Sequence, residues 1–546
     1  MAHDIGIIGG RIVDGSGNPW YYGDVGIKGR TIVKIGRIDG KDCGRVIDAK
    51  GQYVCPGFID IHTHSDVAVI TFPGCDSTLR QGVTTHLIGN CGLSAAPLLE
   101  PNVEVMANYR GSWADVLTKA KWRTFDEYLK FLEKRGVGCN IAALVGHGAV
   151  RTAVMGANRG TPNTKQLNQM KGLVDEAMRA GAFGMSTGLV YPPSCFGKTE
   201  EIIDLCKVVA KYGGMYTSHV RGEREMYADA VKEAILIGEK SGVRVEVSHN
   251  CPKYGAWGRA KEILGIVEAA RQRGLDVTSD NDVHTDLSVT LGRGLPQYLH
   301  ELNEHDLIEH MKSPENRKRV KKEIIEDELP AFGPAGLLKH QRFDRIFMLN
   351  CPKQKKLNGK TVGQIAKARG KDPFETYFDL FVEEENKIIA IFDYISEDDI
   401  KYVLSHPLVM VCSDSSTWSK RGPMTNYFPC AFGEYPGIFE RYVKKEPLLT
   451  IQDAVRKMTS FPAQKIGLFD RGLLRPGMVA DITVIDMERI RDKATNLWPH
   501  EYPFENYPHE YPEGVPYVIV NGKIAVEKSR QNKILAGEVI RHDWRK

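Results

Sequence analysis

Hydrophobic and polar residues alternate in two different ways along the chain, and the change separates two kinds of unit. Near both ends, apolar and polar residues alternate at every second position between glycine turns, which is typical of half-buried β-strands. This pattern covers residues 1–56, for example in DVGIKGRTIVKIG, and it returns within residues 472–546 in ADITVID. We therefore expect the two ends of the chain to pair into one small β-sandwich.

Between these ends, short apolar runs alternate with segments in which apolar residues recur at helical spacing, such as TEEIIDLCKVVAKY. Eight of the apolar runs have the length of a buried strand, and they lie near residues 58–62, 83–89, 141–146, 182–187, 214–219, 244–249, 275–280 and 408–414. Eight strand–helix repeats within residues 57–471 predict a (β/α)8 TIM barrel. The predicted fold class is therefore α/β, with a barrel and a β-sandwich domain built from both termini.

The interval between the last two predicted strands is much longer than the others. Part of it, about residues 288–350, contains charged helical segments such as ENRKRVKKEIIEDE. We expect a helical insertion between strands 7 and 8. It would either cover the mouth of the barrel as a lid or serve as a structural elaboration without a catalytic part.

Composition narrows the class of protein. The chain has 546 residues, of which 42% are apolar and 26% charged, as is typical of globular enzymes. A net charge of +4 does not indicate nucleic-acid binding, and no apolar run is long enough to cross a membrane. The start of the chain lacks the pattern of a signal peptide, and the 11 cysteines follow no paired spacing, so we expect a cytoplasmic protein with a small-molecule substrate. Nothing in these patterns predicts an oligomeric state.

The stretch GFIDIHTHSD ends the first predicted barrel strand with two histidines, His62 and His64. Residues i and i+2 of a strand face the same side, and curvature at the strand end lets both rings converge on one point. Two neutral imidazoles at one point are a common metal-binding arrangement. Taken alone, however, the pair fits hydrogen-bonded structural histidines better than metal ligands. The residues at the other strand ends must therefore decide between these two interpretations.

Metal-capable side chains also follow other predicted strands, at the end of the barrel where catalytic residues collect. Together with the two histidines of strand one they form the set His62, His64, Cys91, His219, His249 and Asp414. Six such side chains, each after an apolar run, predict a metal centre, and imidazoles with a thiolate suit zinc. Zinc would lower the pKa of a bound water, and Asp414 would accept its proton and return it to a leaving nitrogen.

The motifs around these residues resemble the amidohydrolase superfamily and, within it, the D-aminoacylase (N-acyl-D-amino-acid deacylase) family. They span nearly the whole chain and include GGRIVDGSGNP, GFIDIHTHSD, QGVTTHLIGNCGLSAAP, GAFGMSTGLVYPP, YTSHVRGE and HPLVMVCSD. The resemblance implies a zinc-dependent hydrolase that cleaves the amide C–N bond of an N-acyl-D-amino acid or a related compound. It also implies a (β/α)8 barrel with a small terminal β-sandwich.

The resemblance further implies roles for individual residues. The ligands of one tightly bound zinc would be Cys91, His219 and His249. The ligands of a second, weaker position would be His62, His64 and Asp414, with Asp414 also the general acid and base. The substrate contacts would be Tyr191, Lys253, Ser288 and Arg421. The residues supporting His219 from behind would be Arg221 and Glu223.

The expected substrate pocket departs from the family pattern, although no metal ligand is missing. The lysine of strand six appears only at Lys253, the arginine before the Phe-Pro motif is displaced to Arg421, and DNDVHTDLS replaces the usual strand-seven motif. Either Lys253 and Arg421 hold a substrate carboxylate from shifted positions, or the enzyme opens a ring. That ring would be a cyclic amide or a cyclic 1,3-diketone cleaved at a carbon–carbon bond. A non-enzymatic scaffold is the remaining alternative, but scaffolds of this superfamily tend to lose metal ligands.

Overall fold

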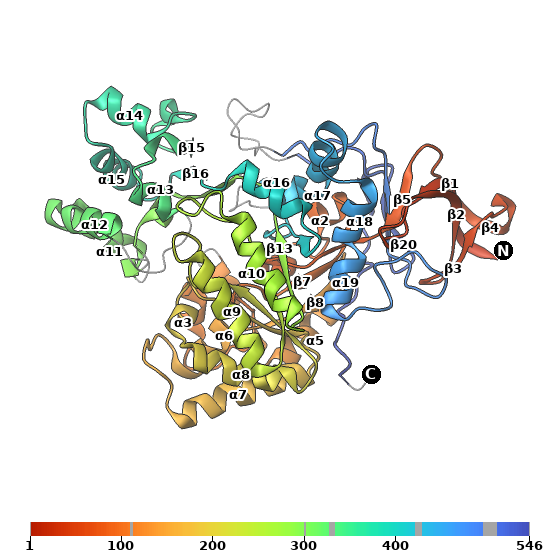
Figure 1. Ribbon diagram of the computed structural model, residues 1–546, viewed down its shortest axis with the longest axis horizontal. Helices are drawn as coiled ribbons and strands as arrows, with labels where there is room; N and C mark the ends of the chain where they lie inside the picture. The colour runs from red at the N-terminus through yellow and green to blue at the C-terminus, as the bar shows by residue number, and fades with distance from the viewer. Residues whose placement is uncertain are drawn as a thin grey trace.

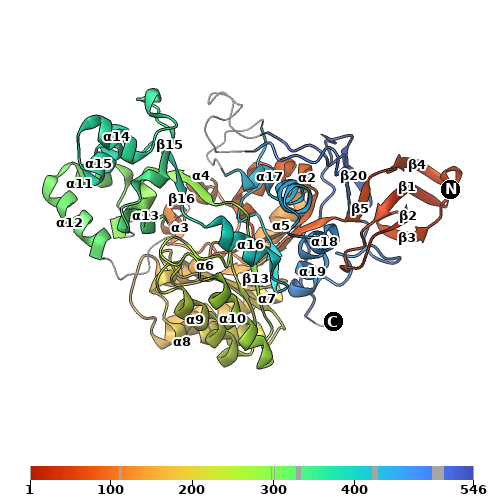
Figure 2. The same ribbon diagram turned by 45° about the horizontal axis from the view of Figure 1, so that its top comes forward.

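The computed structural model describes residues 2–109, 113–296, 298–299, 302–326, 334–420, 428–494 and 510–544. Three parts follow one another along the long axis of the molecule, and both views show the same order (Figures 1 and 2). A β-rich unit lies at one end, a barrel lies in the middle, and an insertion lies at the opposite end. No helix in the described ranges combines the length and the apolar character that a membrane crossing requires.

Strands from both ends of the chain form one sheet, as their alternating pattern predicts. In the described part of the chain its order is β21-β20-β19-β18-β5-β1-β2-β3, with β4 beside β1. The two ends meet where β5 and β18 pair antiparallel and Cys55 lies opposite Thr483. The strands are β1 (His3–Ile12), β2 (Tyr21–Lys28), β3 (Thr31–Gly36), β4 (Cys43–Asp48), β5 (Tyr53–Pro56), β18 (Ile482–Ile485), β19 (Tyr517–Val520), β20 (Lys523–Glu527) and β21 (Arg530–Gln531).

The predicted (β/α)8 barrel is confirmed, and its strands run parallel. Barrel strand three is interrupted and counts as β8 and β9, and a bridge between Thr63 and Ser415 brings the last strand beside the first. Within the described residues the strands are β6 (Phe58–Asp60), β7 (Val83–Ile88), β8 (Asn140–Ala143), β9 (Val145–Gly146), β10 (Gly184–Gly188), β11 (Met215–His219), β12 (Arg244–Val247), β13 (Val277–Asn281) and β17 (Val409–Val411).

Helices cover the outside of the barrel with one apolar face turned inward. In α5, for example, Phe125, Tyr128, Leu129 and Leu132 are buried, and a capping box between Thr124 and Glu127 starts the helix. The helices of the barrel are α1 (Ser65–Thr71), α2 (Asp76–Arg80), α3 (Val103–Tyr109), α4 (Ala114–Thr118), α5 (Phe125–Arg135), α6 (His147–Met155), α7 (Thr164–Arg179), α8 (Thr199–Ala210), α9 (Tyr227–Ser241), α10 (Ala260–Gln272), α16 (Glu397–Ser405), α17 (Cys430–Ile438), α18 (Ile451–Met458) and α19 (Ser460–Ile466).

The insertion between strands 7 and 8 contains a small sheet as well as helices. Its strands have the antiparallel order β14-β16-β15, and β16 returns beside β14 with Asp393 opposite Asp286. The insertion therefore continues past residue 350, where the helical pattern alone would end it. Its elements are β14 (Asp286–Thr290), α11 (Glu304–Lys312), α12 (Pro314–Glu326), α13 (Ala335–Lys339), β15 (Ile346–Asn350), α14 (Val362–Arg369), α15 (Pro373–Glu383) and β16 (Ile389–Asp393).

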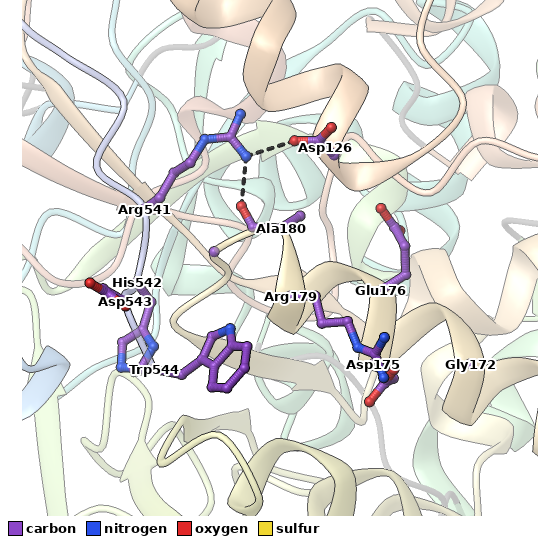
Figure 3. A pocket seen from close by; sticks show the side chains of 11 residues that line it. Asp126, Gly172, Asp175, Glu176, Arg179, Ala180, Arg541, His542, Asp543 and Trp544 are labelled. Atoms are coloured by element: carbon purple, nitrogen blue, oxygen red, sulfur yellow. Dashed lines mark hydrogen bonds and ion pairs between the residues drawn. The ribbon is translucent and has the colours of Figure 1, made fainter. Parts of the chain in front are cut away.

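The C-terminal tail packs under the barrel. Ile141 of β8 donates its backbone N–H to the carbonyl of Glu538, and Ile540 donates to the carbonyl of Ile141. A groove of about 770 Å³ lies beside this tail, and there the Arg541 guanidinium donates to the Asp126 carboxylate at 2.7 Å. Figure 3 shows the side chains that line the groove. Because residues 180–181 of its lining precede β10, the groove lies at the amino end of the strands, away from the predicted site.

Candidate metal centre and active site

The side chains predicted to bind metal converge at the carboxyl ends of the barrel strands, in two groups that share one residue. In each group the potential ligand atoms lie within 4.8 Å of one another. The first group is His62, His64, Cys91 and Asp414. The second group is Cys91, His219 and His249. Cys91 belongs to both groups, so its sulfur would be a ligand of a metal ion held by either one.

The distances between potential ligand atoms fit zinc. The Sγ atom of Cys91 lies 3.3 Å from Nε2 of His62, 3.7 Å from Nδ1 of His219 and 3.8 Å from Nε2 of His249. In a tetrahedral zinc site with bonds of about 2.0–2.3 Å, neighbouring sulfur and nitrogen ligands lie roughly 3.5 Å apart. On the other side of the centre, Oδ1 of Asp414 lies 3.1 Å from Nε2 of His64. The donor atoms thus surround a space of the size and chemistry of a zinc ion.

Three of these residues have a left-handed backbone, which is unusual for side chains other than glycine. The φ angle is 50° at Cys91, 34° at His249 and 45° at Asp414. Such conformations cost roughly 1–3 kcal/mol each and collect at functional sites. Here each turns the chain just after a barrel strand and sends the side chain toward the common centre. The strain therefore coincides with the residues that the metal hypothesis requires.

Glycines allow the loop that carries Cys91 to lie deep in the barrel mouth. A Cβ atom on Gly188 would stand 2.3 Å from the carbonyl oxygen of Cys91, and one on Gly146 would stand 2.4 Å from that of Gly92. Any larger residue at these positions would displace the loop. The glycines of NCGL, VGHG and STGL thus fix the depth of the thiol.

Two buried carboxylates support the histidines from behind. Oε1 of Glu223 lies 3.4 Å from Nε2 of His219 and 3.7 Å from Nδ1 of His249, so it faces the outer nitrogens of both rings. Oδ1 of Asp280, at the end of β13, lies 3.4 Å from Nδ1 of His62 and accepts the backbone N–H of His249. Such carboxylates fix the orientation of metal-binding imidazoles and raise their basicity.

The charges of the site are strongly coupled. Burial raises the pKa of Glu223, but the neighbouring His219, Lys253 and His249 outweigh it and bring that pKa to about 2. Burial lowers the pKa of His64, but its hydrogen bond to Asp414 and the nearby Cys91 raise it to about 9. Without a metal, the site thus holds anionic carboxylates beside protonated imidazoles. A divalent cation can replace those protons.

Two of the four residues predicted to contact substrate, Tyr191 and Lys253, lie against ligands of this centre. The ring of Tyr191 packs edge-on against His219 at 4.8 Å between centroids, and the buried Lys253 donates to the carbonyl of His249 at 3.4 Å. Ser288 is buried in β14, at the start of the insertion. Arg421 lies outside the described residues.

Arg221 has other partners than His219. Its guanidinium donates to the Glu233 carboxylate at 2.9 Å and to the carbonyls of Cys195 and Gly197. Arg221 therefore ties the loop after β10 to α9, because Glu233 offers it a closer carboxylate. The expectation that Arg221 supports His219 directly does not fit these contacts, whereas Glu223 does occupy such a place.

Sequence reasoning missed two residues of the site. Asp280 ends a barrel strand as the metal ligands do, so the same positional signal could have found it. Tyr394 lies just after β16, at the return of the insertion, and it reaches the site only through the folding of that insertion. No local pattern identifies it.

A (β/α)8 barrel whose strand ends gather histidines, a cysteine and an aspartate defines the chain as a metal-dependent hydrolase. The family model described as "Amidohydrolase family" matches residues 45–204 and 348–526, which is more than half of the chain. The chain belongs to the amidohydrolase family. The residues between the two matched parts include most of the insertion.

Characterised proteins resemble the chain over nearly its full length. It is 29% identical to the D-aminoacylase of Alcaligenes xylosoxydans xylosoxydans over 95% of this chain and 93% of the relative. The chain also superimposes on the crystal structure of N-acyl-D-glutamate deacylase from Bordetella bronchiseptica with a TM-score of 0.78 at 27% identity, covering 99% of this chain and 100% of that one. That structure is a complex with zinc and a phosphonate inhibitor that mimics the tetrahedral intermediate. A D-aminoacylase structure with a binuclear metal centre superimposes with a TM-score of 0.77 at 29% identity and the same coverage.

Proposed function

We propose that the protein is a zinc-dependent hydrolase that cleaves the amide C–N bond of an N-acyl-D-amino acid. The observation that carries this proposal is the shared thiol. Sγ of Cys91 belongs to both groups of potential ligands, and relatives similar over nearly the whole chain are D-aminoacylases and deacylases. We assign the tight zinc position to Cys91, His219 and His249, and the second, weaker position to His62, His64 and Asp414 together with the shared Cys91.

Zinc bound at this centre supplies a water molecule with a lowered pKa and polarises the amide carbonyl. The chain's own residues supply the proton transfer. Burial raises the pKa of Asp414, but His62, His64 and His249 hold it well below its usual range, so the carboxylate is ionised, which is the form that a proton acceptor requires. Asp414 then returns the proton to the leaving nitrogen. Tyr191, packed on His219, borders the same space.

A buried cation supports a substrate that carries a carboxylate. Lys253 is 3% exposed, and its ammonium makes one long hydrogen bond, to the carbonyl of His249 at 3.4 Å, within the described part of the chain. An ammonium has three donors, so at least one remains for a ligand. Leaving donors of a buried ammonium without hydrogen bonds is costly, and a substrate carboxylate would supply the missing acceptors. Lys253 is therefore suited to hold a substrate carboxylate, despite its shifted position in the sequence.

The ring-opening alternative has weaker support. The relatives that cover the chain at 27–29% identity act on N-acyl-D-amino acids by name, and no observation in the site selects a ring over an open amide. The position of the insertion does not decide between these substrates. The ring-opening reaction is therefore an outcome of the test rather than a second proposal.

A turnover screen tests the proposal. Zinc-loaded protein is mixed with N-acetyl-D-amino acids, their L-enantiomers, cyclic imides and cyclic 1,3-diketones, and the released products are separated by chromatography. We expect release of free D-amino acid and at least about a tenfold preference for D over L. Turnover of a neutral ring with none of the N-acetyl-D-amino acids would replace the proposal with the ring-opening reaction.

We further propose that the β-sandwich domain consists of residues 1–56 and 472–546 and that the hydrolase domain consists of residues 57–471. The antiparallel pairing of β5 with β18 supports this division, because it joins the two ends into one sheet. We also propose a cytoplasmic location, because reduced cysteines are typical of that compartment. The free cysteines of the described residues include Cys91, which must be a thiolate to bind zinc.

A further inference from the structure

The return of the insertion contacts the loop that follows β12. The carbonyl of Tyr394, just after β16, accepts hydrogen bonds from the backbone N–H of Tyr254 at 2.8 Å and from Nε1 of Trp257 at 3.0 Å. A backbone bridge also joins Ile395 to Lys253. These contacts hold the insertion against the barrel at the residue that the proposed function assigns to the substrate carboxylate.

Tyr394 and Lys253 face each other across this contact. Nζ of Lys253 lies 5.8 Å from the centroid of the Tyr394 ring, a distance at which the ring attracts the cation. Both residues are buried, with 3% of Lys253 and 8% of Tyr394 exposed. The Tyr394 hydroxyl adds a second strong hydrogen-bond donor to this contact. Two buried donors on different elements therefore share one small space.

The surroundings keep both groups in their protonated forms. Burial raises the pKa of Tyr394, and the nearby carboxylates of Glu223, Asp282 and Asp414 raise it further, so the phenol remains a donor. Burial lowers the pKa of Lys253, but Glu223, Cys251, Asp282 and Asp414 together outweigh it, so the pKa is raised and the ammonium remains charged. A phenol and an ammonium together suit an acceptor that bears a negative charge and has two oxygens.

We propose that Tyr394 is a substrate-binding residue which, beside Lys253, donates a hydrogen bond to the carboxylate of the substrate. The insertion would then complete the substrate site through a residue of its own return segment. This inference deepens the proposed function and rests on it for the identity of the substrate. It also predicts that the enzyme discriminates against substrates in which an amide replaces the carboxylate, because a carboxamide has no charge and presents only one acceptor oxygen.

Kinetic discrimination between two matched substrates tests this role. Zinc-loaded wild type, Tyr394→Phe and Lys253→Met are compared on an N-acetyl-D-amino acid and on its carboxamide. We expect Tyr394→Phe to raise KM for the carboxylate substrate about tenfold, as is typical for loss of a hydrogen bond to a charged group, with kcat changed less than threefold. The preference for carboxylate over carboxamide in kcat/KM should fall by a similar factor in each variant.

Tyr254→Phe is the matched control. The Tyr254 hydroxyl accepts a hydrogen bond from Arg342 of the insertion at 2.8 Å and belongs to the same contact without being assigned to the substrate. A structural effect of loosening the insertion should appear in Tyr254→Phe as well, whereas the change in carboxylate preference should not. An equal loss of preference in Tyr254→Phe and Tyr394→Phe would overturn the proposal, as would an unchanged preference in Tyr394→Phe.

Calorimetric binding separates this inference from the proposed function. Isocaproate and isocaproamide contain no scissile N-acyl group and differ only at the carboxylate. Zinc-loaded wild type should bind isocaproate more tightly, and Tyr394→Phe and Lys253→Met should each weaken that binding about tenfold with zinc content unchanged. Binding that both substitutions leave intact would show that other groups hold the anion. Selective binding that depends on both residues, without hydrolysis of any N-acetyl-D-amino acid, would refute the proposed function and leave the anion site standing.

Discussion

Replacing Asp414 by asparagine separates proton transfer from metal binding. Asp414 belongs to the group that contains His62 and His64, while Cys91, His219 and His249 form the other group without it. Asparagine has the same shape, and it tolerates the left-handed backbone, with φ of 45°, that this position requires. The variant should therefore fold and retain the zinc of the second group.

The size of the effect follows from what asparagine cannot do. The carboxylate lies at the centre of the site, with Oδ1 3.1 Å from Nε2 of His64 and 3.4 Å from Nε2 of His62. An amide oxygen can still accept a hydrogen bond there, but it cannot carry a proton from the water to the leaving nitrogen. General acid–base catalysis typically contributes 10²–10⁴-fold, so we expect kcat to fall about 10³-fold.

The assay measures kcat and zinc per chain on the same preparation, the latter by elemental analysis. Asp229→Asn is the control, because Asp229 is an exposed carboxylate on α9 with a side chain 75% exposed. It should change neither quantity. An Asp414→Asn variant with full zinc content and less than a tenfold loss in kcat would refute the assignment of Asp414 as acid and base.

Three further predictions concern the metal. Cys91→Ala should remove most of the zinc and the activity, because the Cys91 thiol belongs to both ligand groups. Cys206→Ala, which removes a buried thiol of α8, should keep both. Equal zinc contents in the two variants would contradict the role of Cys91 as shared ligand. Glu223→Gln should weaken zinc binding 10–100-fold, and excess zinc should restore activity; no change in a chelator competition would remove Glu223 from the site. In the metal-free protein the pKa values of His64 and His219 are raised to about 9, so protons compete with zinc for these imidazoles. Zinc affinity should therefore rise from pH 7 to 9 and then level off. A zinc affinity independent of pH would contradict these pKa values.

The same raised pKa values affect the stability of the metal-free protein. Each imidazolium that is stabilised in the folded state contributes fully below its unfolded pKa of about 6.5, and that contribution is lost as the pH rises through 9. Thermal unfolding of metal-free protein should therefore move to lower temperature between pH 7 and 9. Zinc-loaded protein should show a smaller shift, since its ligands bear no protons to lose.

The barrel and its ligands could be predicted from the sequence because both depend on local patterns. An apolar run of strand length is typical of a barrel strand, which is buried on both faces, and the parallel strands of a barrel have their carboxyl ends on one side. The sequence therefore places the histidines at the ends of β6, β11 and β12 and the aspartate after β17 at one end of the barrel. The pairing of the two chain ends followed in the same way from their alternating residues.

Only the tertiary structure decided how these residues meet. It placed the Cys91 thiol in both ligand groups, set Asp280 behind His62, and paired Arg221 with Glu233 and not with His219. These outcomes depend on the distances between side chains that separate strands and helices bring together, and no local pattern encodes such distances.

The insertion shows the limit most clearly. Its charged helices are visible in the sequence, but the small sheet that turns its end back to the barrel is a pairing between β14 and β16, about a hundred residues apart. That pairing brings Tyr394 to Lys253 from 141 positions further along the chain. A strand's partner is selected by the packing of the whole chain, because its backbone donors and acceptors are alike at every position. The sequence thus determined the kind of centre this protein has, and the folded chain determined which residues stand beside it.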